Sequence, residues 1–582
     1  MFNPRLSGVR AAACVGAIMI ASGGVRADGD SRAYDGWGNN VAHPEWGSAL
    51  SNLMRMMNAD YADGVSDMGG AGRPSPRVIS DAFHQGRTPR WSQRVLTSMV
   101  FHWGQFIDHD IDLTTDTSGE SAPISIPGDD AWMTPGGTIP FIRSIYDPTT
   151  GLGPGDPREQ VNMITSYIDG SNVYGSSEAR ALALREFVNG RLLEGPNGLL
   201  PWNTLGVSMA DPFGRPPEQL FAAGDVRANE QPGLTALHTL FVREHNRLAA
   251  RYKQVHPNWN DEQLYQRARE YNWALIQAIT YNEFLPALLG EGAMPPYTGY
   301  KTGVNASIAS EFSAGSYRFG HSMVNPTLPR YLEGGVPHPS GPLDLFSSFF
   351  NPDAIISSGG IEPILRGEFG ELAQEIDPFV VDDLRNLLFG GGGIGLDLAS
   401  INIQRGRDHG LRSYNDVREA MGLGRAQTWS DISSVPDVQQ RLASVYATPD
   451  DVDLWIGGLC EDHLPGSSLG PTHQAVIVDQ FKRLRDGDRY FYASHLSAND
   501  VFNINQTTLA DVIRRNTNIH FVQDNVFFVS ADLNRDADVN YLDVIDFLVA
   551  FSAGDDSANF VPDLVLDFND VLAFLTAFNR YF

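Results

Sequence analysis

One segment of the chain, FHWGQFIDHDIDL, combines acid–base and metal-ligand side chains at helical spacing. Gln105, Asp108 and His109 stand at i, i+3 and i+4, so in a helix all three side chains leave one face about one turn apart. A carboxylate and an imidazole are costly to bury unless each is paired, covalently bonded or bound to a metal. The segment therefore indicates a chemically active face on an apolar helix, although a solvated helix face near a loop would show the same pattern.

A second segment, TSYIDGS, repeats oxygen-bearing side chains. Thr165, Asp169 and Ser171 lie along an expected extended loop, in which alternate residues point the same way. With the Tyr167 carbonyl and with Asp110 from the preceding helix, these oxygens could surround one calcium ion. The same residue types also form ordinary turns, so this segment alone leaves both interpretations open.

Three further segments bring together histidine, arginine and carboxylate side chains. AGDVRANEQPG carries Arg227 and Glu230 just before a periodic helix that is expected to begin near Pro232. His321 in SYRFGHSMV is either a core histidine or a metal ligand. In SINIQRGRDHGLRSYN, three arginines that include Arg405 crowd the end of an apolar helix. Arginines there could neutralise buried carboxylates, including those of a cofactor.

Helical periodicity surrounds these segments. Apolar residues recur at steps of three and four from residue 93 onward, most clearly over 234–252 and 262–289, and alternating strand patterns are scarce. The stretch up to about residue 90 is rich in Gly, Pro and Asn, and we expect an irregular wrap there with one short helix over 50–58. The pattern predicts a mainly α protein, with one large helical domain and a small helical module at the C-terminus.

The composition narrows the possible functions. The chain has 42 Lys plus Arg against 70 Asp plus Glu, a formal net charge of −28. This acidic balance argues against nucleic acids and anionic membrane surfaces as partners. Hydrophobic residues make up 42% of the chain, which is typical of a globular protein.

The N-terminus has the pattern of an export signal. Arg5 and Arg10 precede an apolar run over 11–21, and small residues at Val25 and Ala27 suit signal peptidase. We therefore predict a signal peptide over 1–27 and a secreted or cell-envelope protein. The apolar run is too short for a transmembrane span. Removal of this segment leaves Cys460 as the one cysteine of the mature chain, so no disulfide framework is expected, and the sequence assigns Cys460 no role.

The C-terminal tail has a composition of its own. Its last 51 residues hold ten acids and two bases, and an oxygen-rich loop there precedes the apolar helix pattern of 544–551. The loop resembles a dockerin-type calcium loop, with Asp in its final place, and 559–570 resembles a degenerate second copy. We expect the main domain to span 28–530 and the tail 531–582, with the tail serving either to dock to an extracellular or cell-surface protein or as an acidic, solubilising extension. The calcium ligands expected in the first loop are Asp532, Asn534, Asp536, Asp538, Asn540 and Asp543.

Several long motifs stand in the order found in one family. WGQ-x-x-DHD, TS-x-x-D-x-S-x-VYG, AGD-x-R-x-x-E, REHNRLA, R-x-GH, N-x-QR-x-RDHG and QFKRLRDGDRYF resemble those of the animal haem peroxidases, the group of myeloperoxidase, lactoperoxidase, thyroid peroxidase and peroxidasin. The resemblance runs from YDGWGNN, which begins at residue 34, to NVFFV, which ends at residue 529. It implies a secreted peroxidase with haem b and calcium.

The resemblance also implies roles for single residues. His109 would be the distal base that moves a proton of hydrogen peroxide, Arg227 would stabilise the developing negative charge, and Gln105 would hold the distal water and the halide. His321 would bind the haem iron, with its other ring nitrogen donating to Asn402.

The remaining implied residues bind the cofactors. Asp108 and Glu230 would be esterified to haem methyl groups, and Arg318 and Arg405 would face the haem propionates. Gln231 occupies the place of the methionine that myeloperoxidase links to its haem, which puts strong chloride oxidation in doubt and favours bromide, iodide, thiocyanate or small organic donors. The calcium ligands implied in the main domain are Asp110, Thr165, the Tyr167 carbonyl, Asp169 and Ser171.

Two other functional classes stay open from the sequence. A fatty-acid oxygenase of the cyclooxygenase type shares the distal Gln and His spacing, but it needs a tyrosine three residues before the proximal histidine, where this chain has Arg318 and where Tyr317 is one place further away. Such enzymes also lack the Asp108 ester and the calcium motif. A matrix or adhesion protein without catalysis would have no need to keep the full set of distal and proximal residues.

Overall fold

The structure is a computed structural model that describes residues 31–84, 90–333, 336–388, 395–520, 522–534, 539–560 and 565–579. The chain divides into two units, Met1–Arg32 and Ala33–Phe582. Every element described below belongs to the second unit. The signal peptide predicted over 1–27 lies outside the described residues.

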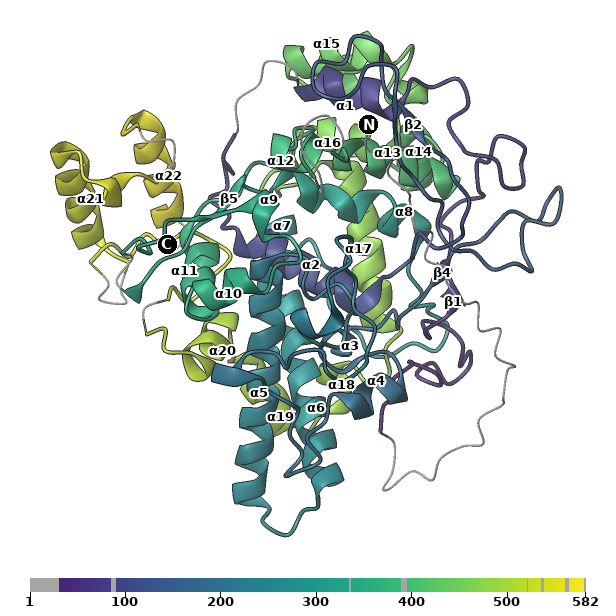
Figure 1. Cartoon of the computed structure of the whole chain (residues 1–582). Coiled ribbons are helices and arrows are strands. Elements are labelled where there is room, and N and C mark those ends of the chain that lie inside the picture. Colours follow the sequence, from purple (N-terminus) through teal and green to yellow (C-terminus); the bar gives the residue numbers. More distant parts are fainter. Residues whose placement is uncertain are drawn as a thin grey trace, which may run out of the picture. The chain divides into compact units, whose positions relative to one another are not determined.

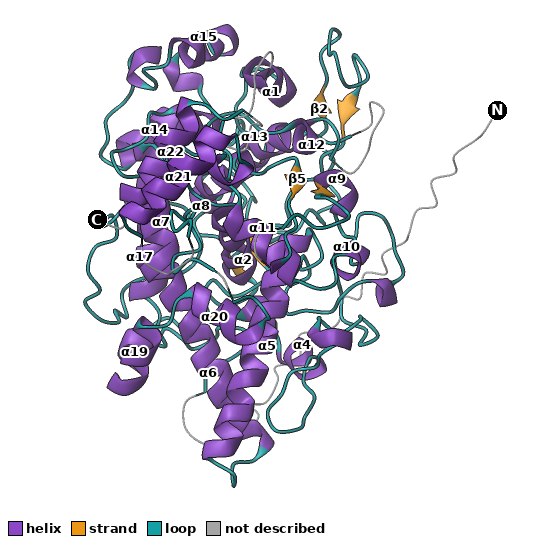
Figure 2. Ribbon diagram, turned by 90° about the vertical axis from the view of Figure 1, so that its left-hand side faces the viewer, coloured by secondary structure: helices purple, strands orange, loops and turns teal. Residues whose placement is uncertain are grey.

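Helices dominate the described chain, and strands are few and short, which confirms the mainly α fold class (Figure 2). The described strands form three two-stranded antiparallel sheets, β1 (Ser51–Asn52) with β4 (Val161–Asn162), β2 (Ile124–Ser125) with β3 (Thr138–Ile139), and β5 (Thr327–Leu328) with β6 (Leu343–Asp344). Over the part of the chain that the structure describes, none of the helices combines the length and the apolar character needed to cross a membrane.

The α-helices are α1 (Pro76–His84), α2 (Met99–Ile111), α3 (Ser171–Tyr174), α4 (Glu178–Ala183), α5 (Pro232–Val255), α6 (Asp261–Ile279), α7 (Leu285–Leu289), α8 (Ser310–Ser313), α9 (Leu345–Ser348), α10 (Asp353–Ser357), α11 (Glu362–Gly370), α12 (Asp382–Arg385), α13 (Leu398–Asp408), α14 (Tyr414–Ala420), α15 (Pro436–Val445), α16 (Leu454–Cys460), α17 (Pro471–Asp486), α18 (Tyr492–His495), α19 (Ala498–Asn505), α20 (Leu509–Asn516), α21 (Tyr541–Ala553) and α22 (Phe568–Phe578). A π-helical turn, η3 (Thr280–Phe284), joins α6 to α7, and a 3₁₀ helix, η4 (Ser316–Ser322), follows α8.

The short helix expected over 50–58 is absent, and that prediction was wrong. Leu50 has a φ of 64°, and the next two residues form β1. The following backbone N–H groups of Leu53 and Met54 donate to the distant carbonyls of Gln160 and Ile308, at 2.7 and 2.9 Å. Ser and Asn are weak helix formers, so pairing with distant chain satisfies this backbone better than a local helix would.

Helix α2 lies in the interior of the fold. In Figure 1 it runs through the middle of the helical body, with the long hairpin of α5 and α6 beside it. All residues of α2 are buried except Gln105 and Asp108. Helix α5 begins where the sequence pattern predicts, with Pro232 in its first turn and the Gln231 side chain accepting from the Gly233 N–H at its N-cap.

A second group of elements faces α2 from distant parts of the sequence. The helix η4 contacts α2, α8, α13, α16 and α17. Helix α13 starts at an N-cap formed by Asp397, whose side chain accepts from the Ser400 N–H and binds Arg77 at 2.8 Å. Because Asp397 and Arg77 are both fully buried, this ion pair fixes the start of α13 against α1.

The tail forms two helices that pack on each other. The rings of Phe547 in α21 and Phe574 in α22 stack with their centres 4.2 Å apart, and Phe560 meets both rings edge-on. The stacked pair therefore lies in the shared core of α21 and α22.

Candidate functional site

An internal cavity of about 420 Å³ collects most of the residues singled out in the sequence. This volume lies in the range of about 300–1,000 Å³ that is usual for small-molecule and cofactor sites. Its walls come from α2, the segment before α5, η4 and the end of α13. The candidate residues in its lining are Gln105, Asp108, His109, Arg227, Glu230, Arg318, His321 and Arg405.

One face of helix α2 forms a wall of the cavity. Gln105, Asp108 and His109 all line the cavity, as their spacing predicts. The side chain of Gln105 accepts a hydrogen bond of 3.2 Å from the amide of Gln231. The side chains of Asp108 and Glu230 are 32% and 30% exposed. Both residues line the cavity, so this exposed surface faces the cavity.

Arg227 is held in place by Asp225, a residue to which the sequence analysis gave no role. Asp225 accepts from Nε and Nη2 of Arg227 at 2.9 and 3.0 Å and from its backbone N–H at 2.8 Å. Arg227 also donates to Asp108 at 3.3 Å and to the Asp112 carbonyl at 2.8 Å. Asp225 stands only two residues before Arg227, and this spacing in AGDVR was the available signal for it.

His109 is a neutral base in this environment. Burial lowers the pKa of His109 well below its usual value, and the neighbouring Arg227 guanidinium lowers it further, against the attraction of Asp225. Its Nδ1 lies 3.5 Å from Asp225 and has no hydrogen-bond partner among the described residues. Its Nε2 lies 3.9 Å from the Glu230 carboxylate. A neutral ring can accept a proton, as a general base must.

The two carboxyl groups in the cavity are poorly stabilised as anions. Burial raises the pKa of Asp108 to about 7, although the Arg227 guanidinium opposes this effect. Burial likewise raises the pKa of Glu230 to about 7, against Arg227 and a hydrogen bond from the Gln105 side chain. A bonded, uncharged form of either group would remove this desolvation cost.

His321, on η4, lines the same cavity. Its Nδ1 lies 2.8 Å from the Asn402 amide nitrogen, and burial lowers the pKa of His321 to about 3. Asn402 Oδ1 in turn accepts from Arg318 at 3.2 Å. This amide orientation differs from the expected donation of the ring to Asn402, because the guanidinium of Arg318 draws the amide oxygen away from the ring.

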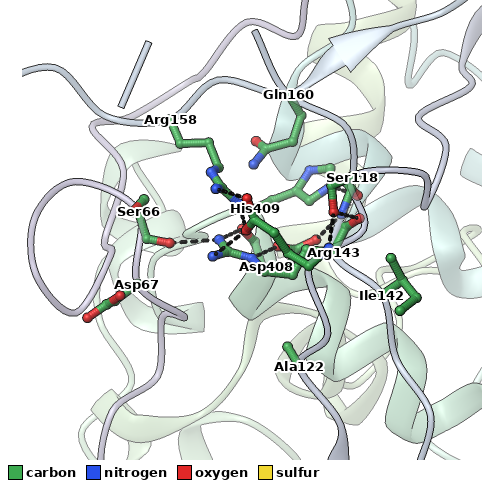
Figure 3. Close-up of polar contacts among 12 residues, drawn as sticks. Ser66, Asp67, Ser118, Ala122, Ile142, Arg143, Arg158, Gln160, Asp408 and His409 are labelled. Carbon is green, nitrogen blue, oxygen red and sulfur yellow. Dashed lines mark hydrogen bonds and ion pairs between the residues drawn. The ribbon is translucent and has the colours of Figure 1, made fainter. Parts of the chain in front are cut away.

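Figure 3 shows Arg143, Asp408 and His409 close together at the C-terminal end of α13, and Arg405 binds to the same Asp408. Arg405 donates to the side chains of Ser144 and Asp408, at 2.8 and 2.9 Å. The buried Asp408 also accepts from Arg143 Nε at 2.6 Å and from the Ser144 backbone at 2.7 Å, and His409 bonds to the Ser144 hydroxyl at 2.8 Å. The network fixes one side of Arg405, while its Nη2 has no protein partner among the described residues and is available to a ligand.

The oxygen groups expected to bind calcium do lie together. Asp110 in α2 accepts from the N–H groups of Gly170 and Asn172, and its carbonyl accepts from the Ser171 hydroxyl at 2.8 Å. The Thr165 hydroxyl donates to Asp169 at 3.1 Å and lies 3.5 Å from the Tyr167 carbonyl. Burial raises the pKa of Asp110 to about 8, and the adjacent Asp169 adds to this effect.

The first tail loop is only partly described. Asp543, which is fully buried, accepts from the backbone N–H groups of Leu533 and Asn540 at 2.8 Å each, and so closes the loop onto α21. Asp536 and Asp538 lie outside the described residues. Within the described ranges, no cluster of three or more His, Cys, Asp or Glu side chains is placed to hold a metal ion, either here or in the main domain.

Comparison with known proteins gives consistent matches. Residues 31–527 match the protein family described as animal haem peroxidase. Peroxinectin A of Dictyostelium discoideum is 40% identical over 515 residues, which cover 85% of this chain and 95% of that protein. The solved structure of peroxidase A from the same organism superimposes with a TM-score of 0.81 at 38% identity, covering 86% of this chain and all of that one. A fatty acid α-dioxygenase from Oryza sativa has a TM-score of 0.72 at 23% identity, which shows a shared fold alone.

Proposed function

Since this chain belongs to the animal haem peroxidase family and is a haem peroxidase, we propose that it reduces hydrogen peroxide in the described cavity and oxidises bromide, iodide, thiocyanate or small organic donors. The observation that carries this proposal is the position of His109 beside the Asp225–Arg227 ion pair, in the same cavity that His321 lines.

The residues around the cavity fit a haem. His321 would offer Nε2 as an iron ligand in the tautomer with the proton on Nδ1, which requires the Asn402 amide to turn its oxygen toward the ring. Arg318 and Arg405 each keep Nη2 without a protein partner among the described residues, so both can bind a carboxylate. When bound, the haem supplies the iron at which the O–O bond of the peroxide is broken heterolytically.

The distal side chains handle the proton and the charge. His109 accepts a proton from one oxygen of hydrogen peroxide. It then returns this proton to the other oxygen, which leaves as water. The Arg227 guanidinium stabilises the negative charge that develops on the leaving oxygen, and Asp225 fixes its orientation. Gln105 holds the water or anion in the same cavity through its amide.

Asp108 and Glu230 are the proposed points of covalent attachment. Each carboxyl group would replace one hydrogen of a haem methyl group, and one hydrogen peroxide per ester would be reduced to two waters, which balances the oxidation. The raised pKa of each carboxyl, caused first by burial, supports an uncharged ester at these positions. Acid–acetone extraction tests this idea: the haem should stay with the parent protein and become extractable from Asp108→Asn plus Glu230→Gln, and full extraction from the parent would refute it.

We propose calcium at the oxygen cluster of Asp110, Thr165, the Tyr167 carbonyl, Asp169 and Ser171. Hard cations prefer such carboxylate, hydroxyl and carbonyl oxygens, and a bound cation would neutralise two adjacent buried carboxylates. Because Asp110 directly follows His109 in α2, this ion would fix the position of His109 in the cavity.

The export signal and the tail complete the proposal. We propose that residues 1–27 direct secretion to the cell envelope or the exterior, and that 28–530 and 531–582 are separate modules.

The tail helices α21 and α22 expose large apolar side chains, which supports a docking role toward an extracellular or cell-surface protein. Examples are Ile545, Val549, Phe568 and Leu572, which are 48%, 64%, 75% and 55% exposed. Calcium titration of the full-length protein and of a chain ending at residue 530, followed by circular dichroism, tests the tail: helix gained only with the tail present supports the loop, and no difference refutes it.

One experiment separates the candidate functions. The haem-loaded protein is given hydrogen peroxide with bromide, iodide, thiocyanate, chloride, a phenol or palmitic acid, and peroxide loss and donor oxidation are followed together. Stoichiometric oxidation of a halide, thiocyanate or the phenol supports the proposal. Oxygen uptake with palmitic acid and no peroxide consumption would replace it with a fatty-acid oxygenase.

A further inference from the structure

A line of aromatic rings begins at the wall of the cavity. Tyr317 on η4 lines the cavity, and its hydroxyl donates to the Gly104 carbonyl of α2 at 3.2 Å. The Tyr317 ring meets the ring of the fully buried Phe481 in α17, with the two centres 5.7 Å apart. The Phe481 ring in turn meets the Tyr281 ring edge-on at 6.2 Å. Both separations are typical of aromatic side chains in contact.

The line continues from Tyr281 to the surface. Tyr281 stands in the π-helical turn η3 and packs against two separate clusters of buried apolar side chains, so it bridges them. Its ring meets Phe491 edge-on at 5.3 Å, and Phe491 meets Tyr297 at 4.8 Å. Tyr297 is partly exposed, and its hydroxyl bonds to the exposed Ser494 hydroxyl at 2.9 Å. Rings in contact therefore join the cavity to the surface, and we call these five residues the aromatic path.

Tyrosine and phenylalanine alternate along the aromatic path. Each tyrosine can lose one electron, and each phenylalanine ring fills the space between two tyrosines, so that an electron tunnels across only one ring at a time. Apolar packing alone would not need the hydroxyl groups, because a buried hydroxyl costs free energy unless it is bonded. Tyr281 offsets this cost with a 2.7 Å hydrogen bond to the Phe481 carbonyl. The alternation therefore favours a redox role over packing alone.

The outer end of the aromatic path suits a phenol as electron donor. The guanidinium carbon of Arg485 lies 5.3 Å from the centre of the Tyr297 ring, and its positive charge favours loss of the phenolic proton. The exposed Ser494 hydroxyl beside this phenol gives the proton a route to water. Transfer of a hydrogen atom from a donor phenol to a tyrosine radical exchanges like for like, so the step is nearly balanced in free energy.

We propose that the aromatic path carries electrons to the cavity and that Tyr297 is a surface site for oxidising phenols carried on polymers too large for the cavity. The inference rests on the proposed function, which supplies hydrogen peroxide as the oxidant. Tyr297 loses an electron through the path and its proton to water, and its radical then takes a hydrogen atom from the polymer. Two polymer phenols thus become two phenoxyl radicals, while one hydrogen peroxide becomes two waters. Small donors reach the cavity of about 420 Å³ directly and do not need this route.

The first test follows the radical without any donor. The haem-loaded protein is mixed with one equivalent of hydrogen peroxide and a nitroso spin trap, and the labelled residue is identified by mass spectrometry. Tyr297 should carry the label in the parent and lose it in Tyr281→Phe, which keeps the ring packing but removes the intermediate tyrosine. A parent without label on Tyr297, or equal labelling in Tyr281→Phe, would overturn the path.

The second test compares a large donor with a small one. Tyramine coupled to dextran is the large donor and iodide the small one, and both oxidations are followed with hydrogen peroxide. Tyr297→Phe should lose oxidation of the coupled tyramine and keep the iodide rate, whereas Tyr297→Trp, which keeps an oxidisable ring, should restore it. The matched control is Tyr300→Phe, which should leave both rates unchanged. Tyr300 is also partly exposed, but its hydroxyl accepts from the Val41 N–H at 3.1 Å and no ring contact joins it to the aromatic path.

The outcomes separate the inference from the proposed function. Full oxidation of the coupled tyramine by Tyr297→Phe, or an equal loss in Tyr300→Phe, would overturn the surface site and leave the peroxidase proposal intact. A parent protein that binds haem but oxidises neither iodide nor free tyramine with peroxide would overturn the proposed function and, with it, this inference.

Discussion

Replacement of Asp225 by asparagine tests how the cavity positions Arg227. Asp225 accepts three hydrogen bonds from Arg227, of 2.8 to 3.0 Å, and lies 3.5 Å from His109 Nδ1. Asparagine keeps the shape but removes the charge, and it turns one acceptor into a donor that repels the guanidinium. Arg227 would then keep its hydrogen bond to the Asp112 carbonyl, 2.8 Å away, as its remaining strong contact.

The expected size of the effect follows from these contacts. Breaking a buried ion pair by neutralising one partner costs about 3–5 kcal/mol of unfolding free energy. Because the Asp112 carbonyl still accepts from Arg227, we expect the lower end, about 3 kcal/mol. Loss of one aligned charge-stabilising donor slows catalysis by about 10²–10³-fold. We therefore expect the second-order rate constant for hydrogen peroxide to fall about 100-fold in Asp225→Asn.

The assay is stopped-flow mixing of the haem-loaded protein with peroxide, alongside unfolding in guanidinium chloride. Glu244→Gln is the matched control, because the fully buried Glu244 binds Arg247 and Arg515, at 2.8 and 2.6 Å, away from the cavity lining. It should lose stability but keep the rate. A full rate in Asp225→Asn, or an equal loss in Glu244→Gln, would refute the positioning role of Asp225.

Three further predictions concern the donor, the calcium site and acid stability. With Gln231 beside the cavity, bromide should be oxidised much faster than chloride near neutral pH, and comparable steady-state rates would contradict this. Chelation should lower the free energy of unfolding by about 2.7 kcal/mol in a buffer that holds calcium at 100 times its dissociation constant, but not in Asp169→Asn, as measured by urea titration with and without EDTA. Burial alone would raise the pKa of Asp453, but Arg407 and Arg73 lower it to about 2, so its contribution of about 2 kcal/mol is complete above pH 4 and lost as the pH falls toward 2. Asp453→Asn should therefore flatten that part of an acid-unfolding curve followed by circular dichroism, and an unchanged slope would count against this pairing.

The sequence predicts those features that are local. Gln105, Asp108 and His109 share one helix, so their spacing alone places them on one face of α2, as the structure finds. The start of α5 at Pro232 likewise follows from the proline, and the apolar period over 544–551 lies within α21. The helix expected over 50–58 failed because its backbone pairs with Val161–Asn162, more than a hundred residues away.

Contacts between residues that lie far apart in the sequence could not be predicted from residue spacing. His321 and Asn402 meet from segments 81 residues apart, and the sequence linked them only through the family resemblance. Arg143 and Asp408, 265 residues apart, were not linked at all, because neither segment carries a sign of the other. The proximity of His102 to Glu368 could not be predicted either, because a single histidine on a helix is usually an ordinary core residue.

Removal of the distal base tests the central claim most directly. In His109→Ala the haem should still bind, since His321, Arg318 and Arg405 are untouched, and the haem absorption band reports this. The second-order rate constant for hydrogen peroxide, measured by stopped flow, should fall by about 10²–10⁴-fold, the usual contribution of a positioned base. A variant that binds haem and reacts with peroxide at the parent rate would contradict the assignment of this cavity as a peroxidase site with His109 as its base.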